Sequence, residues 1–290
     1  SCPWTAGGAP SHRGGRPPGR SAVPPERGRS APQALSRAYP LPVELLILAA
    51  TIGAWQLARI PFEGSTRVAL SHARDWIALE RRLHVEIEPS ILRFVHSREW
   101  LLSSAKWFYA NLNETAMLAF MTVARLVDPI RYPKLRTAYV LLHLPALAIL
   151  ALYPLAPPHW VHGLPYADGP PLHPSALRNE TAAAVSLHFG GPLLIAAGAL
   201  WLRPRAPLAW LTLIYPPLVF MVILGTGNHY VLDTLVGSAC VGAGLAAAQI
   251  IHGPLPRGSA SMSASRIAFL GAGVALIAFL VNGGFLGELV

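Results

Sequence analysis

The sequence predicts an all-α integral membrane protein, on three observations. Of its 290 residues, 53% are hydrophobic and only 13% are charged, whereas about 25% of the residues of a soluble domain are charged. Seven apolar segments have about the 20 residues that a helix needs to cross the roughly 30 Å hydrocarbon core of a bilayer. None of them shows the two-residue alternation of a half-buried strand.

The predicted membrane helices are separated by polar or proline-containing segments. In chain order we expect them near residues 41–60, 106–127, 137–156, 186–202, 207–225, 230–251 and 267–287. The fourth is short, but the Arg203-Pro204-Arg205 stretch that follows it indicates that a helix ends there at a membrane surface.

Two further stretches lie outside these helices. Residues 1–38 are rich in Pro, Gly, Ser and Arg, with six arginines and one acid, Glu26. Such a chain cannot bury a core, so we expect a disordered cytoplasmic tail or, alternatively, an arm that binds anionic lipid. Residues 61–104 have balanced charges and apolar residues at helical spacing, as in WIALERRLHVEIEPSILRFV. We expect one or two amphipathic interfacial helices there, separated by Pro89.

The distribution of basic residues predicts how the chain is oriented. Short basic connections follow the second, fourth and sixth helices, among them RLVDPIRYPKLR and the segment 252–266. Because cytoplasmic loops are enriched in Lys and Arg, we expect these connections and the N-terminus in the cytoplasm. Residues 157–185 and 225–229 then lie on the extracytoplasmic side. The arginines of 61–104 also fall outside, against the rule, although that segment is nearly neutral.

The residues best suited to chemistry gather on the extracytoplasmic side. His229 and Asp233 are four residues apart at the start of the sixth helix, so they share one helical face. His188 opens the fourth helix and is expected at the same membrane depth. Ionisable groups at that depth are costly and usually line a bundle interior or a wet cavity. A carboxylate can orient an imidazole nucleophile, and a second histidine can serve as general acid and base.

Other interpretations of the same residues are open at this level. Two histidines and an aspartate are also ligands that Zn²⁺ accepts. The two cysteines, Cys2 and Cys240, have no metal-type spacing, and neither is placed to pair with the other. We favour a site without a metal.

The motifs around these residues resemble those of a known family. SLHFG, residues 186–190, and GNHYVLDTLVG, residues 227–237, are similar to the paired signature of the type-2 phosphatidic acid phosphatase superfamily. The stretches RYPKLRTAYVLLHLPALAILALYPLAPPHW and ALERRLHVEIEPSI resemble the family's third helix and the segment between its first two helices. The likeness covers residues 41–251 and is greatest to the branch that contains inositol phosphorylceramide synthases and many bacterial relatives.

The resemblance carries expectations about fold and mechanism. It implies a bundle of six membrane helices with a site near the membrane surface. It implies that His229 attacks phosphorus and forms a phosphohistidine, that Asp233 orients His229, and that His188 protonates the leaving group and then deprotonates the acceptor. The acceptor is water in a phosphatase and an alcohol in a phosphotransferase, such as an inositolphosphotransferase. The scheme needs no cofactor and no metal.

Three positions depart from the family's pattern and bear on phosphate binding. Val185 stands where a proline is usual, His159 follows the Pro-Pro pair where an arginine is common, and Ile223 stands where the wider superfamily has an arginine. Because a transferred phosphoryl group needs donors for its oxygens, other residues must supply them. The candidates are four groups on the outer side and two motif residues: Arg178, His159, Lys106, Arg59, Ser186 and Asn228.

Polar residues inside two of the membrane helices are further candidates. Asn111, Asn113 and Glu114 interrupt the second helix and are expected either to line the substrate cavity or to pair between helices. His143, within the third helix, is expected to be a packed or hydrogen-bonded residue rather than a ligand.

The expected organisation is a basic cytoplasmic tail, a catalytic membrane domain and an added helix. The boundaries are 1–38 for the tail, 41–251 for the six-helix domain with its interfacial segment 61–104, 252–266 for a cytoplasmic loop and 267–290 for the extra helix. We expect a lipid phosphate phosphatase or phosphoalcohol transferase of a bacterial cytoplasmic membrane. Its partners would be the bilayer, a lipid phosphate or phospholipid and an alcohol acceptor, but not nucleic acid. A non-catalytic lipid-binding member and a transporter are the alternatives.

Overall fold

A computed structural model describes residues 37–161, 179 and 181–254 of the chain. The described residues are helical apart from turns, connections and one isolated bridge between Leu155 and Ala182. The predicted all-α class is confirmed for this part. The predicted tail up to residue 36, the predicted helix 267–287 and Arg178 lie outside the described residues.

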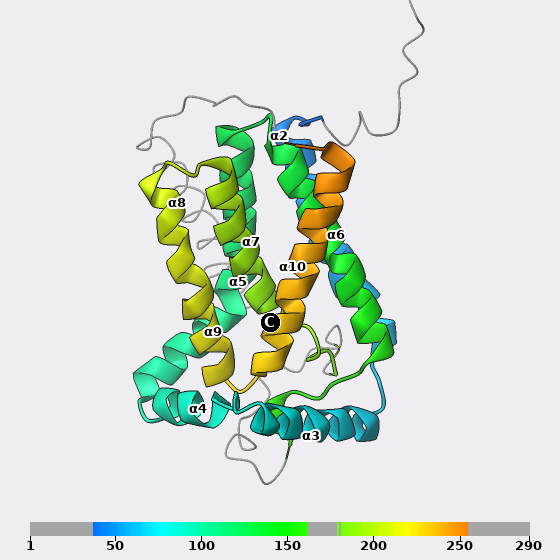
Figure 1. The fold of residues 1–290 in the computed structure, drawn as a ribbon, viewed down its shortest axis with the longest axis vertical. Helices are drawn as coiled ribbons and strands as arrows, with labels where there is room; N and C mark the ends of the chain where they lie inside the picture. The colour runs from blue at the N-terminus through cyan, green and yellow to red at the C-terminus, as the bar shows by residue number, and fades with distance from the viewer. Residues whose placement is uncertain (1–36, 162–178, 180, 255–290) are drawn as a thin grey trace, which may run out of the picture. The chain divides into compact units, whose positions relative to one another are not determined.

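Figure 1 shows how the helices are arranged. In chain order they are α2 (Leu41–Ala58), η1 (Ile60–Phe62), α3 (Thr66–Arg82), α4 (Glu88–His96), α5 (Glu99–Val127), α6 (Tyr132–Leu152), η2 (Pro158–Trp160), α7 (Leu187–Leu202), α8 (Pro207–Leu211), η3 (Thr212–Ile214), α9 (Tyr215–Gly225) and α10 (Val231–His252). The helices α5, α6, α7, α9 and α10 stand side by side, and α3 and α4 lie across their lower ends (Figure 1).

Four of the described segments are long and apolar enough to cross a membrane. They are Leu41–Phe62, Tyr132–Leu152, Pro207–Gly225 and Val231–His252, and α7 is an apolar but shorter helix. The helix α5 is long, but Asn111, Asn113 and Glu114 near its middle lower its hydropathy. The four segments fit a multi-pass membrane protein.

Prolines explain two of the differences between the observed helices and the predicted spans; a third is that α5 begins at Glu99, within the segment 61–104 that was predicted to be interfacial, rather than near residue 106. The third predicted helix was expected to reach residue 156, but α6 ends at Leu152 because Pro154 cannot donate to a helical ladder. The predicted helix 207–225 is divided into α8, η3 and α9, since Pro216 and Pro217 remove two backbone donors from the turn that joins them. The predicted boundary at Pro89 is confirmed, because Pro89 lies in the first turn of α4.

The helix α10 packs most extensively against α6 and also contacts α7. Glycines allow these close approaches. A Cβ added at Gly244 would lie 2.5 Å from the backbone oxygen of Ala138 on α6, and a Cβ added at Gly237 would overlap the backbone oxygen of Ser186 just before α7. Small residues at helix crossings let backbones approach in this way. The two glycines therefore set the separation of α10 from both neighbours.

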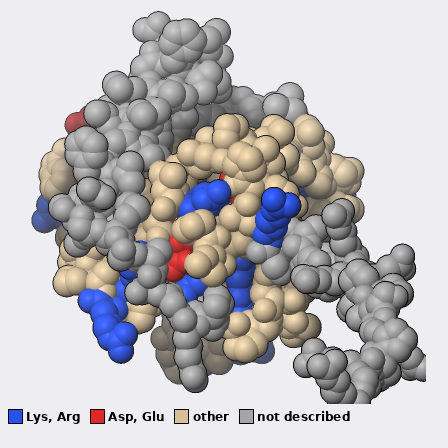
Figure 2. All heavy atoms as spheres, turned by 90° about the horizontal axis from the view of Figure 1, so that it is seen from above, with Lys and Arg blue, Asp and Glu red and all other residues tan. Residues whose placement is uncertain are grey.

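Basic side chains gather at the end of the bundle that is farther from α3 and α4. Arg131 donates to the carbonyl of Leu202 at 3.0 Å, and Lys134 on α6 bonds Gln249 and the carbonyl of Gly253 at the end of α10. Figure 2, which views this end, shows lysine and arginine side chains between the helix ends, with few acidic ones. The carbonyl groups at the C-terminal end of a helix carry partial negative charge and attract such cations.

One buried ion pair joins α2 to α6 at this end. The Arg136 guanidinium lies 2.6 Å from the Glu44 carboxylate, and both side chains are at most 5% exposed. Arg136 also donates to the carbonyl of Arg37 at 3.3 Å. Together with the burial of Leu48 against α5 and α6, this pair attaches α2 to the bundle.

We expect Arg136→Ala to lower the free energy of unfolding in detergent by about 3–5 kcal/mol, because it leaves a buried carboxylate without its partner. The double replacement Arg136→Met with Glu44→Leu should recover part of this loss. Unfolding by denaturant titration measures both, with the exposed Arg67→Ala as control. Equal stability of Arg136→Ala and the parent would show that the pair does not hold α2.

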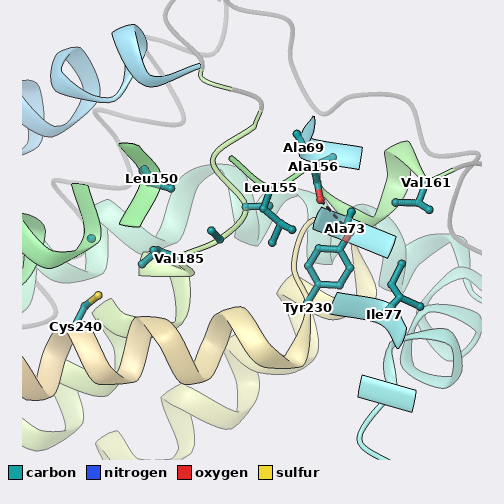
Figure 3. Close-up of a cluster of buried hydrophobic side chains, with 13 residues drawn as sticks. Ala69, Ala73, Ile77, Leu150, Leu155, Ala156, Val161, Val185, Tyr230 and Cys240 are labelled. Atoms are coloured by element: carbon teal, nitrogen blue, oxygen red, sulfur yellow. Dashed lines mark hydrogen bonds between the residues drawn. The ribbon is translucent and has the colours of Figure 1, made fainter. Parts of the chain in front are cut away.

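The lower layer is held by an apolar cluster around Tyr230. Ala69, Ala73 and Ile77 on one face of α3 are buried against it, together with Leu155 and Val161. Figure 3 shows the Tyr230 ring among these side chains, with its hydroxyl donating to the carbonyl of Ala156 at 2.9 Å. The cluster packs α3 directly beneath the start of α10.

Candidate functional site

The turn before α10 presents His229. Gly227 has a φ of 69°, a backbone conformation that favours glycine, and the chain reverses there between α9 and α10. The Asn228 side chain steadies the turn by donating to the hydroxyl of Thr226 at 2.9 Å. The local sequence GTGNH thus places His229 immediately before the first turn of α10.

Asp233 fixes the His229 ring. His229 Nδ1 lies 2.9 Å from Asp233 Oδ2, and the same oxygen accepts the backbone N–H of Tyr230 at 2.9 Å. Asp233 is fully buried and His229 is 6% exposed. Because Nδ1 is held by the carboxylate, the other ring nitrogen, Nε2, faces the cavity beside Tyr109, whose hydroxyl lies 3.5 Å away. The pair predicted from the i+4 spacing is therefore formed.

His188 lies beside this pair. It is in the first turn of α7, and the centroids of the His188 and His229 rings are 5.4 Å apart. Tyr109 on α5 stacks on His188 with a centroid distance of 4.4 Å, so it touches both histidines. This role of Tyr109 could not be predicted from the sequence, because Tyr109 is one of several aromatic residues in α5.

A backbone hydrogen bond fixes the start of α7 against the first turn of α10. The N–H of Ser186 donates to the carbonyl of Asp233 at 3.2 Å, and the Ser186 hydroxyl accepts from the N–H of Phe189 at 3.3 Å. Ser186 is therefore the N-cap of α7. It is fully buried and does not line the cavity, and its observed role is to cap α7.

A cavity of about 330 Å³ opens beside the two histidines and extends between α2, α5 and α6. Of the predicted phosphate-binding residues, Arg59, His159 and Asn228 line it. Arg59 is the only Lys or Arg side chain among the described residues of its wall. His159 is held by Gly227, whose carbonyl lies 3.2 Å from His159 Nδ1. Lys106 does not line the cavity.

The far part of the cavity is polar although it lies between membrane helices. Asn113 and Glu114 line it, as one of the two sequence interpretations expected, and Gln56 on α2 faces them. Gln56 donates to the Glu114 carboxylate at 2.9 Å. His143 also reaches the wall, while its Nδ1 lies 2.8 Å from the carbonyl of Tyr139. This hydrogen bond fits the expectation that His143 is a packed residue.

Two acidic residues of the amphipathic segment are buried beneath the site. Glu80 on α3 and Glu88 on α4 are 1% and 3% exposed, and both accept backbone N–H groups at the start of α10. The sequence interpretation counted them among the charges of an interfacial surface, so their burial is a departure from it. Ile223, at the position where the wider superfamily has an arginine, is fully buried in an apolar cluster.

In the part of the chain that the structure describes, no group of three or more His, Cys, Asp or Glu side chains is arranged to hold a metal ion.

The comparison with known families matches residues 74–247 to the PAP2 superfamily. The match spans more than half of the chain and contains both histidines, Asp233 and the carboxylates of α3 and α4. The chain therefore belongs to the PAP2 superfamily. Members of this superfamily are generally phosphatases or phosphotransferases, which associates the chain with lipid phosphates and with membranes. Neither the curated proteins nor the solved structures contain a significant match to the sequence.

Proposed function

We propose that the protein is a membrane-embedded phosphoryl-transfer enzyme that acts on a lipid phosphate or phospholipid through a phosphohistidine at His229. The observation that carries the proposal is the arrangement of His229, Asp233 and His188 at one end of a cavity of about 330 Å³. This is a nucleophile with its orienting carboxylate, and a second imidazole close enough to reach the same substrate.

The first half of the reaction forms the phosphoenzyme. His229 Nε2 attacks phosphorus while the bond from phosphorus to the leaving oxygen breaks, and protonated His188 gives its proton to that oxygen. Asp233 stabilises the positive charge that develops on the His229 ring, because it accepts the Nδ1 proton at 2.9 Å. The ring centroids of the two histidines lie 5.4 Å apart, which is close enough for both imidazoles to contact one phosphoryl group.

The second half transfers the phosphoryl group to an acceptor. His188, now neutral, takes the proton of a water or alcohol hydroxyl, whose oxygen attacks phosphorus as the bond to His229 Nε2 breaks. The wall of the cavity carries polar side chains that suit a hydroxyl-bearing acceptor, among them Gln56, Asn113 and Glu114. These side chains support an alcohol as well as water as the acceptor, and hence an inositolphosphotransferase-like branch of the family.

The finer topology is also part of the proposal. We propose that α5 and α7 cross the membrane with the four apolar segments and complete a six-helix catalytic domain over residues 41–251. The basic helix ends lie at the opposite end of α10 from His229. By the positive-inside rule, this supports a cytoplasmic N-terminus and an extracytoplasmic site in a bacterial cytoplasmic membrane.

The test is an assay of both reactions in detergent micelles. Phosphate release and transfer to an added alcohol are measured in parallel, with a panel of lipid phosphates and phospholipids as donors. We expect at least one donor to react, and the alcohol to compete with water for the phosphoryl group. A parent protein that performs neither reaction with any donor would overturn the proposal.

We expect Arg59→Gln to raise the KM for a lipid phosphate by about tenfold to a hundredfold, since a hydrogen bond to a charged group contributes about 1.5–3 kcal/mol. The kcat should change less, because the nucleophile and the general acid remain in place. Arg67→Gln, at an exposed position outside the cavity, is the matched control. An unchanged KM would remove Arg59 from the phosphate-binding residues.

A further inference from the structure

Two carboxylates from the lower layer bind the first turn of α10. Glu88 Oε1 accepts the N–H of Val231 at 2.7 Å, and Glu80 Oε1 accepts the N–H of Leu232 at 2.9 Å. These amides follow His229 by two and three residues. The contacts are long-range in the chain, because Glu88 and Glu80 precede the residues they bind by 143 and 152 positions. They are the polar contacts by which α3 and α4 hold the start of α10.

The second oxygens of the two carboxyl groups require a proton. Glu80 Oε2 and Glu88 Oε2 are buried and have no donor among the described residues. Each carboxyl lies close enough to the other for a hydrogen bond between them to shift its pKa, and two ionised carboxylates offer no donor to one another. Burial raises the pKa of Glu80 to about 9, with the charge of Glu88 as the next cause, and burial also raises the pKa of Glu88. One proton between the two groups satisfies both oxygens.

Other acidic groups around Glu80 and Glu88 make it more costly to ionise both carboxyls. Asp233 on α10 further raises the pKa of Glu80, and Glu86, between α3 and α4, raises that of Glu88. Arg81 on α3 is 55% exposed and binds Glu86 at 3.0 Å. On α10 itself, the Asp233 carboxylate is already bound to the ring of His229. With both glutamates ionised, three buried carboxylates would meet at one helix start.

We propose that Glu80 and Glu88 are positioning residues that share one proton, and that this shared proton holds α3 and α4 against the start of α10 and fixes the turn that carries His229. The inference rests on the function proposed above, because its catalytic consequence is the placement of His229. Loss of the proton separates the carboxylates, loosens the two amide contacts and lets the His229 turn move away from His188.

The pH dependence follows from the sign of the shift. The pKa of Glu80 in the folded protein, about 9, exceeds its ordinary value of 4.5. The state in which α3 and α4 hold the start of α10 therefore binds a proton that is released when they separate from it. The stabilisation is therefore complete below about pH 4.5, decreases as the pH rises and is lost as the pH passes about 9.

The experiment compares Glu80→Gln with Glu80→Ala from pH 6 to pH 10. Glutamine keeps the acceptor for the Leu232 amide and donates an N–H to Glu88 without needing a proton. We expect alanine to lower kcat about tenfold or more at pH 7, and glutamine to recover most of that loss. The ratio of the glutamine variant's activity to the parent's should rise as the pH increases toward about 9, by at most about tenfold per pH unit, and level off above it, because both forms have then lost the proton. Glu63→Gln, at an exposed position, should keep the parent's profile.

Hydrogen exchange gives a readout that does not depend on activity. After correction for the intrinsic rate at each pH, the amides of a peptide spanning residues 226–236 should lose protection in the parent as the pH rises toward about 9 and keep it in Glu80→Gln. The same alkaline loss of protection in both proteins would overturn the inference. If the parent transfers no phosphoryl group, the proposed function fails, and the exchange data still decide whether the shared proton holds the turn.

Discussion

His229→Ala is expected to abolish turnover, with a fall in kcat/KM of about 10⁴-fold or more, because it removes the proposed nucleophile of the reaction. In the proposed reaction the phosphoryl group is bonded to His229 Nε2, so the parent should retain label after brief reaction with a labelled lipid phosphate and an alkaline quench. That label should be stable to alkali, labile to acid and absent from His229→Ala.

The control for this variant is His84→Asn. His84 is an exposed histidine with a φ of 56°, a conformation that asparagine tolerates, so the replacement should leave both turnover and labelling unchanged. Activity that survives in His229→Ala would show that another group attacks phosphorus. A parent that turns over without any trapped label, even under rapid quench, would favour direct attack by water.

Gly237→Ala is expected to lower kcat by about a hundredfold although residue 237 touches no substrate. A Cβ at this position would overlap the backbone oxygen of Ser186, and backbone cannot give way as a flexible side chain can. The start of α7 must therefore move away from α10, and His188 moves with it. Misplacement of a catalytic group by about 1 Å can cost about 10²-fold, and the overpacking itself should cost about 1–3 kcal/mol of stability.

Gly242→Ala on the same helix is a close control. Its added Cβ would have nothing within 4 Å, so it tests the effect of a glycine replacement in α10 without the clash. Here we expect near-parental kcat and, since alanine favours helix, equal or slightly higher stability. Equal activity of Gly237→Ala and Gly242→Ala would mean that the spacing of α7 and α10 does not control the His188 position.

The His229–Asp233 pair and the proximity of His188 could be predicted from the sequence. The i+4 spacing of His229 and Asp233 placed both on one helical face, and the charge pattern of the loops placed His188 at the same depth. These are local or topological properties, and the 2.9 Å contact and the 5.4 Å ring separation agree with them. Of Asn111, Asn113 and Glu114, the last two line the cavity wall and Asn111 does not, while Glu114 also pairs between helices with Gln56, so each of the two alternatives holds in part.

The supporting residues could not be predicted in the same way. Glu80 and Glu88 read as charges of an amphipathic surface, because helical periodicity does not reveal which carboxylate will bind the start of another helix more than 140 residues later. Tyr109 had no distinguishing neighbour in the sequence. Lys106 has the charge that a phosphate needs, but its place on α5 keeps it out of the cavity wall. The charge of a residue does not indicate which side of its helix faces the cavity.

The start of α10 has a consequence for how the protein can recognise an anion. Helix N-termini often bind phosphate through free backbone amides and a favourable dipole. Here the amides of Tyr230, Val231 and Leu232 are already taken by carboxylates from three helices. These three amides are therefore not available as an anion hole, and a phosphoryl group on His229 would need its donors from other parts of the cavity wall.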